Sequence, residues 1–125
     1  MRDRPTIGKM PHIHLETTSD LEENAHVPDI LEALTLCLSS QETVPSKSIK
    51  GYHTLRSVWH MGEGAPAGFA HCEVALLNNR PIELRQKIAK DMMVVMREQF
   101  ASSIEQGLVS VTLEIREMDK DTYMK

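Results

Sequence analysis

The chain has 125 residues, with 14 basic and 18 acidic side chains and a formal net charge of −4 at pH 7. Its hydrophobic share of 41% and charged share of 26% are ordinary for globular proteins, which excludes a disordered or fibrous chain. The negative balance argues against a nucleic-acid partner, and the lack of any apolar run near the roughly 20 residues of a membrane span argues against a membrane partner.

The first ten residues show no hydrophobic periodicity. They are polar and contain a proline and a glycine, and no apolar segment follows their charged start, so a secretory signal is not expected. We expect residues 1–10 to be a flexible leader or to precede the true start of translation. Residues 11–125 are expected to form a single domain of a cytoplasmic protein.

The first half of this domain has the pattern strand, helix, strand. Polar and apolar residues alternate over His12–Glu16, which predicts a strand that turns Ile13 and Leu15 towards a core and its two histidines away from it. A turn follows, and Val27–Ser39 has a proline near its start and apolar residues spaced three or four apart, as a helix requires. The mixed segment Ile49–Trp59 predicts the second strand.

The second half repeats this pattern. Phe69–Leu77 predicts a strand. In the turn that follows, Asn78 or Asn79 is expected to cap a helix, with Pro81 in its first turn. The spacing of apolar residues predicts one long helix that ends at Gly107, where glycine suits a left-handed cap.

The last strand is predicted at Leu108–Ile115, where apolar residues share one period-two face. The order is therefore two tandem β-α-β units. Because such crossovers are right-handed and make their strands parallel, we predict an α/β (α+β) fold with a four-stranded sheet and both helices on one face. The chain offers no third layer for the other face, so we expect further subunits to cover it.

Most polar motifs in the sequence favour structural roles. His12 and His14 share a strand face, but no third ligand is near in sequence, so no metal site is expected. Glycine-rich phosphate motifs and the serine nucleophile elbow are absent from the sequence. Cys37 and Cys72 form no close pair, and each is expected to be a small buried apolar side chain.

The dipeptide Met10-Pro11 allows two interpretations. If translation begins at Met10 and this residue is removed, Pro11 becomes an N-terminal secondary amine. An α-amino group has a pKa near ~7.7–8.0, which nearby cations lower further, and it can then act as a general base. Otherwise Pro11 simply begins a strand, where its missing N–H is harmless. Spacing alone favours the second interpretation.

Six short runs, spread between Pro11 and Glu117, carry a resemblance to a known family. They are Pro11–Glu16, Asp20–Glu23, Val44-Pro45, Val58-Trp59, Arg80–Arg85 and Leu113–Ile115. The most specific are the Pro-His start and the motif Arg-x-[Leu/Ile]-Glu-x-Arg at the opening of the second long helix. Together these runs resemble the 5-carboxymethyl-2-hydroxymuconate isomerase family of the tautomerase superfamily.

The resemblance implies a homotrimer of tandem β-α-β subunits and a reaction without cofactor. Pro11 would act as the base, taking a proton from a dienol and returning it to carbon to form the conjugated ketone. Arg80 falls on a catalytic arginine of the family, and Lys50 stands in place of its other catalytic arginine, keeping the charge but losing bidentate recognition. Tyr52 stands where a further arginine is common, and it would line the substrate site together with His12, Lys50 and Arg80.

We therefore predict an isomerase, similar to 5-carboxymethyl-2-hydroxymuconate delta-isomerase, that acts on a small 2-hydroxymuconate-type dienol acid from the catabolism of aromatic compounds. This activity requires Pro11 at the mature N-terminus, because an amide nitrogen has no lone pair to act as base. If residues 1–10 remain, the alternative is a non-catalytic trimer that binds a small anion. A third alternative is a hydratase or dehalogenase that uses the same proline and arginine.

Overall fold

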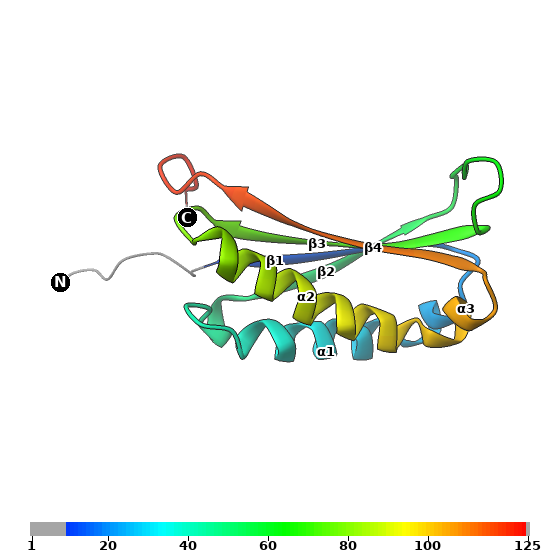
Figure 1. The fold of residues 1–125 in the computed structure, drawn as a ribbon, viewed down its shortest axis with the longest axis horizontal. Helices are drawn as coiled ribbons and strands as arrows, with labels where there is room; N and C mark the ends of the chain where they lie inside the picture. Colours follow the sequence, from blue (N-terminus) through cyan, green and yellow to red (C-terminus); the bar gives the residue numbers. More distant parts are fainter. Residues whose placement is uncertain (1–9, 125) are drawn as a thin grey trace.

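The computed structural model describes residues 10–124, which contain a four-stranded sheet with helices packed on it (Figure 1). In chain order, the elements of the first half are β1 (His12–Thr18), the 3-10 helix η1 (Glu22–His26), α1 (Val27–Ser39), η2 (Ser46–Ser48) and β2 (Lys50–Arg56). Those of the second half are β3 (Gly68–Leu77), α2 (Ile82–Gln99), α3 (Ala101–Glu105) and β4 (Val109–Met118). The predicted order of two strand-helix-strand units is confirmed.

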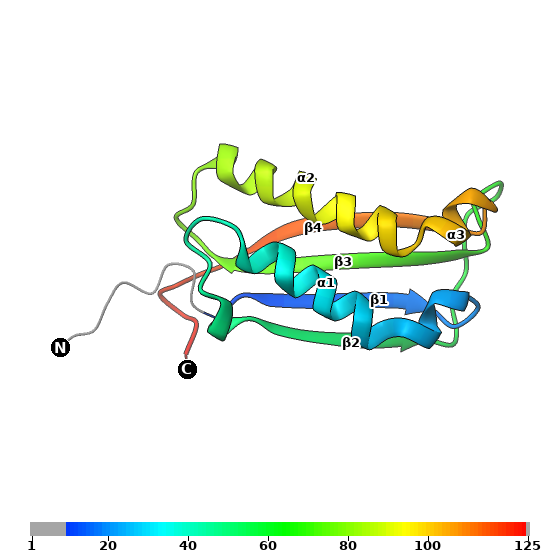
Figure 2. The same cartoon turned by 90° about the horizontal axis from the view of Figure 1, so that it is seen from below.

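The strands lie in the order β2-β1-β3-β4. The two strands of each unit are parallel, and the central pair, β1 and β3, is antiparallel. Figures 1 and 2 show α1 and α2 side by side on the same face of the sheet. This confirms the predicted four-stranded sheet with its helices on one face, as two right-handed crossovers require. The opposite face of the sheet is called the outer face below.

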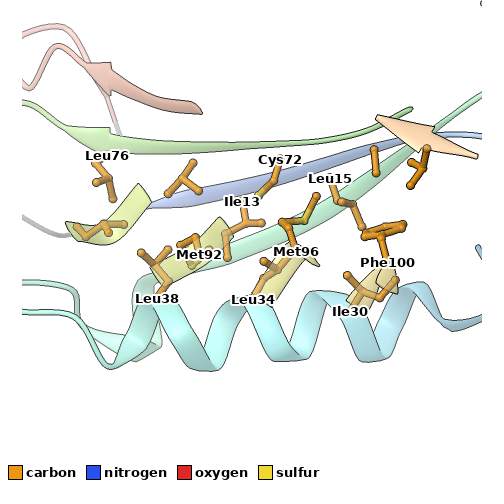
Figure 3. Close-up of a cluster of buried hydrophobic side chains, with 14 of the residues drawn as sticks. Ile13, Leu15, Ile30, Leu34, Leu38, Cys72, Leu76, Met92, Met96 and Phe100 are labelled. Carbon is orange, nitrogen blue, oxygen red and sulfur yellow. The ribbon is translucent and has the colours of Figure 1, made fainter. Parts of the chain in front are cut away.

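The core lies between the sheet and the two long helices. The period-two burial of β1 turns Ile13 and Leu15 inward, and both are fully buried. The helices meet them with residues spaced three or four apart, shown in part in Figure 3: Ile30, Leu34 and Leu38 from α1, and Ile88, Met92 and Met96 from α2. Burial of each such side chain contributes roughly 1.5–3 kcal/mol, so this packing holds both helices on one face. Within residues 10–124, no helix combines the length and apolarity needed to cross a membrane.

The two cysteines differ in burial. Cys72 is fully buried in the core, as predicted, and burial raises the pKa of its thiol to about 12, so the unreactive thiol form dominates. The prediction of burial is wrong for Cys37, which is only half-buried. It lies on α1 beside the buried Leu38, at the edge of the apolar stripe rather than at its centre.

The predicted long second helix is in fact two helices. α2 ends at Gln99, the backbone leaves helical geometry at the fully buried Phe100, and α3 follows. In a continuous helix the N–H of Ser103 would donate to the carbonyl of Gln99. Here it donates to the carboxylate of Glu23 at 3.1 Å, which stabilises the break. Gly107 has a φ of 72°, so the predicted left-handed residue is present, although it ends α3.

The start of α2 also differs from the prediction. Pro81 is the N-cap rather than a residue of the first turn, and no side chain caps the helix. The prediction of an asparagine cap is wrong because both asparagines have other roles. The side chain of Asn78 accepts a hydrogen bond from the N–H of Lys120 at 3.3 Å, and Asn79 takes a left-handed φ of 89° that turns the chain.

The second strand is shorter than predicted, because its pairing with β1 stops at Thr18 and Arg56. Trp59, expected near the end of this strand, lies in the loop between β2 and β3. Its indole N–H donates to the carbonyl of Ala67 at 2.9 Å and ties the two ends of this loop together.

Candidate functional site

The predicted site residues gather at one end of the sheet, where β1 and β2 begin and β3 and β4 end. Pro11 precedes β1, Lys50 is the first residue of β2, and Arg80 lies in the loop between β3 and α2. Figure 2 shows this end on the left, with the loop after α1 and the C-terminal segment close by. Because β1 and β3 are antiparallel, the start of one lies beside the end of the other, and residues from distant parts of the chain meet there.

Pro11 is buried, and a hydrogen bond to its carbonyl group fixes its position. This carbonyl accepts a hydrogen bond from the N–H of Lys50 at 3.0 Å, which extends the parallel pairing of β1 and β2 beyond His12. Proline suits the place before a strand because no ladder bond from its nitrogen is needed there. The candidate base is therefore fixed beside the first residue of β2.

The other predicted binding residues lie on the outer face. The pairing of β1 with β2 places His12 opposite Lys50, and His14 opposite Tyr52. The ring of Tyr52 is 48% exposed and stacks on the ring of His14, with centroids 4.7 Å apart and an angle of 18° between the planes. The sheet thus brings together a cation, two imidazoles and a phenol near the buried Pro11.

His12 lies among positive charges. Burial is the first cause that lowers its pKa, and the positive charges of Lys50 and Arg116 lower it further. The strand pairing explains why the charge of Arg116 acts on His12. Ala75 of β3 lies opposite His12 of β1 on one side and opposite Arg116 of β4 on the other. The ring is therefore neutral at pH 7, in an environment that favours a bound anion.

Arg80 is enclosed rather than open, with 4% of its surface exposed. Its Nε donates to Thr43 Oγ1 at 3.0 Å, its Nη2 to the carbonyl of Thr43 at 3.0 Å, and its Nη1 to the carbonyl of Leu77 at 2.9 Å. Burial lowers the pKa of Arg80, and the negative charge of Glu117 opposes this shift. Arg80 thus joins the loop after α1 to the end of β3, and two of its five N–H groups have no acceptor among residues 10–124.

Two residues of this region were missed by the sequence analysis. Thr43, which accepts two of the hydrogen bonds from Arg80, has a φ of 68°, an unusual conformation for a β-branched residue. Tyr123, close to the C-terminus, has its hydroxyl oxygen 3.2 Å from Nε2 of His12. No local pattern could have identified either residue, because each contact joins distant segments.

The strand histidines have partners other than metal. Nε2 of His14 lies 2.8 Å from Oγ1 of Thr54, and His12 contacts Tyr123. Within the described part of the chain, no three His, Cys, Asp or Glu side chains are grouped so that they could hold a metal ion.

A separate hollow of about 290 Å³ lies between the end of α1 and the start of α2, lined by Ser40, Gln41, Glu42, Leu84 and Lys87. Two of its polar side chains, Gln41 and Lys87, are already hydrogen-bonded within the protein. The side chains of Gln41 and Lys87 both donate to the carboxylate of Asp91, at 2.9 and 2.8 Å. None of the predicted site residues lines this hollow, so the end of the sheet is the better candidate site.

Comparison with known proteins shows the family of the chain. Residues 11–125 match the model of the 5-carboxymethyl-2-hydroxymuconate isomerase family, a match that begins at Pro11. A relative from Escherichia coli, 5-carboxymethyl-2-hydroxymuconate Delta-isomerase, is 23% identical over 110 residues, which cover 87% of each chain.

Solved structures share the fold. A 5-carboxymethyl-2-hydroxymuconate isomerase from Deinococcus radiodurans R1 is similar with a TM-score of 0.86 and 22% identity, over 95% of this chain and 90% of that chain. A fused 4-OT described as a symmetric trimer is similar with a TM-score of 0.68 and 19% identity, over 91% of this chain and 90% of that chain. Proteins with this arrangement of two β-α-β units therefore include a trimer.

Proposed function

The chain belongs to the 5-carboxymethyl-2-hydroxymuconate isomerase family of the tautomerase superfamily, and from this premise we propose that it ketonises a 2-hydroxymuconate-type dienol acid such as 5-carboxymethyl-2-hydroxymuconate. The observation that carries the proposal is the family match over residues 11–125, which begins at the proline that would supply a base as an N-terminal amine. The reaction moves a proton within one molecule and needs no cofactor.

Pro11 is the proposed base. As an N-terminal secondary amine it takes the hydroxyl proton of the dienol. The electron pair of that O–H bond forms the second bond of the new C=O, and the two conjugated C=C bonds shift along the chain, so that one C=C bond remains and the distal carbon gains an electron pair. The protonated amine then returns the proton to carbon, which yields the conjugated ketone and regenerates the base. The position of Pro11 beside Lys50 supports this role, because a nearby cation lowers the pKa of an amine towards neutrality.

Lys50 and Arg80 are the proposed carboxylate-binding and oxyanion-stabilising groups. The ammonium group of Lys50 shares its sheet row with His12, and we propose that His12 and Tyr52 line the same site on the outer face. Arg80 contributes its two remaining N–H groups from an enclosed position. Fixed donors of this kind stabilise developing negative charge because they need no reorganisation during the reaction.

A homotrimer is the proposed assembly, in a cytoplasmic enzyme of aromatic-compound catabolism. The outer face supports a subunit contact because its charged side chains are arranged in pairs across neighbouring strands. Glu73 pairs with Arg116 at 3.3 Å, and His71 lies 3.3 Å from Glu114. A fold relative described as a symmetric trimer supports the same assembly.

The decisive experiment tests whether the protein begins at Pro11 and whether it ketonises the dienol. Intact mass and N-terminal sequencing of the protein from its native source would be measured together with an ultraviolet assay of 2-hydroxymuconate ketonisation. We expect a chain that begins at Pro11 and ketonises the dienol, with a lower kcat in Pro11→Ala. A chain that begins at Met1 and lacks activity would contradict the proposal and favour the anion-binding trimer. Turnover of a haloacrylate but not of the dienol would favour the dehalogenase alternative.

A further inference from the structure

Residues 119–123 form a closed turn after β4. The N–H groups of Thr122 and Tyr123 donate to the carbonyl of Asp119 at 3.1 and 3.0 Å, and that of Asp121 donates to the Asp119 carboxylate at 2.9 Å. These bonds satisfy the backbone within the turn, so Tyr123 has a defined position.

This turn is also attached to the loop that carries Arg80. The N–H of Asn78 donates to the carbonyl of Met118 at 2.9 Å, and the N–H of Lys120 donates to the side chain of Asn78 at 3.3 Å. Asn78 lies two residues before Arg80. The C-terminal turn and the Arg80 loop are therefore held together at the site end of the sheet (Figure 2).

Tyr123 packs on the outer face beside His12. Its ring contacts a small apolar cluster formed by the buried residues Ala75, Leu77 and Met118, which is separate from the main core. Ala75 pairs with His12 across β1 and β3, and the rings of Tyr123 and His12 meet edge to face with centroids 5.9 Å apart. The phenol oxygen lies 3.2 Å from Nε2 of His12.

The contact joins the C-terminus to the predicted binding residues. His12 directly follows Pro11 in the chain and lies opposite Lys50. Because burial and the charges of Lys50 and Arg116 keep its ring neutral, one ring nitrogen carries a proton and the other accepts. Which nitrogen carries the proton depends on the hydrogen bond that the other nitrogen makes.

We propose that Tyr123 is a positioning residue, whose hydroxyl donates to Nε2 of His12 and thereby fixes an Nδ1–H donor beside Lys50 for the carboxylate of the substrate. This inference rests on the proposed isomerase function and adds a residue to it. A donor that is already oriented binds an anion more tightly than one that must first be ordered.

The first test compares Tyr123→Phe with the neighbouring control Thr122→Val. Both variants are made with the N-terminus found in the protein from its native source. The phenylalanine keeps the ring on the apolar cluster and removes only the hydroxyl. Since one hydrogen bond contributes about 0.5–1.5 kcal/mol, we expect KM to rise by roughly 2- to 10-fold with kcat changed by less than about twofold. We expect the control to behave as the unchanged protein.

The second test does not depend on turnover. Binding of glutarate, a simple dicarboxylate, would be measured by NMR, and the tautomer of His12 by its ¹⁵N shifts. We expect a single Nδ1–H tautomer that becomes a mixture in Tyr123→Phe, together with a weaker glutarate affinity by the same roughly 2- to 10-fold.

The outcomes separate the two proposals. An unchanged tautomer and affinity in Tyr123→Phe, or an equal loss of affinity in Thr122→Val, would overturn the role of Tyr123 while leaving the isomerase intact. A protein without dienol turnover would contradict the isomerase, and the glutarate and tautomer measurements would then decide the role of Tyr123 alone.

Discussion

Arg80 combines a structural task with a proposed chemical one. Three of its N–H groups are used within the protein, on the side chain and carbonyl of Thr43 and on the carbonyl of Leu77. Two of these acceptors are carbonyl groups that need a donor when enclosed. The arrangement orders the loop before α2, and the proposed anion site depends on that order as well as on the charge.

The two tasks of Arg80 can be separated by mutation. Arg80→Ala removes the charge and leaves its acceptors unpaired, so we expect kcat/KM to fall by roughly 10²-fold and the free energy of unfolding to fall by about 1–3 kcal/mol. Thr43→Val removes one acceptor and keeps the charge, so we expect a smaller loss of both quantities. Steady-state kinetics and urea unfolding would measure them, and unchanged kinetics in Arg80→Ala would exclude this residue from the site.

At the scale of elements, the junction of α2 and α3 depends on a buried carboxylate from the first half of the chain. Glu23 is 6% exposed, and it accepts from both the N–H and the hydroxyl of Ser103, at 3.1 and 2.7 Å. A buried carboxylate is costly unless its oxygens are hydrogen-bonded, and the backbone N–H of Ser103 is equally costly if left unpaired. The break at Phe100 and the 3-10 helix η1 therefore stabilise each other.

This mutual dependence predicts unequal effects for neighbouring glutamates. Glu23→Ala leaves the buried N–H and hydroxyl of Ser103 without a partner, so we expect the free energy of unfolding to fall by about 1–3 kcal/mol. Glu22→Ala loses only exposed contacts with Ser102 and Gln106, so we expect a change within about 0.5 kcal/mol. Urea unfolding with both variants checks this, and equal losses would show that Glu23 does not specifically stabilise the junction.

For the molecule as a whole, two histidines make stability depend on pH. Burial lowers the pKa of His53, as the nearby His14 also does, and burial with Lys50 and Arg116 lowers that of His12. The hydroxyl of Thr17 donates to the side chain of Asn24, so it accepts at 2.7 Å from an Nε2–H of His53. The folded protein therefore favours the neutral form of both rings.

The direction of the pH effect follows from these lowered values. Below the ordinary histidine pKa of 6.5, the unfolded chain binds more protons than the folded one, so the free energy of unfolding falls as the pH falls through this window. We expect urea unfolding at a fixed protein concentration to give lower stability at about pH 5.5 than at about pH 7.5. In His53→Gln the free energy of unfolding should change less with pH. If it changes as much as in the unmodified protein, other groups cause the pH dependence.

Local periodicity was sufficient to predict the four strands, the two long helices and the single face of the sheet that these helices cover. The alternation in β1 and the three-four spacing in α1 each report a single buried face, and right-handed crossovers make the two strands of each unit parallel. The Pro-His start and the motif that begins at Arg80 further indicated the family. These properties depend on neighbours within a few residues, so the sequence by itself determined them.

The tertiary structure alone decided how the site is held. Thr43 and Arg80 are 37 positions apart, Glu23 and Ser103 are 80 apart, and His12 and Tyr123 are 111 apart. Such pairs have no period or spacing that a sequence pattern could reveal, because their contact exists only after the sheet and helices have packed. The surroundings of Arg80, the break after α2 and the contact of the C-terminal turn with His12 are therefore products of the folded chain.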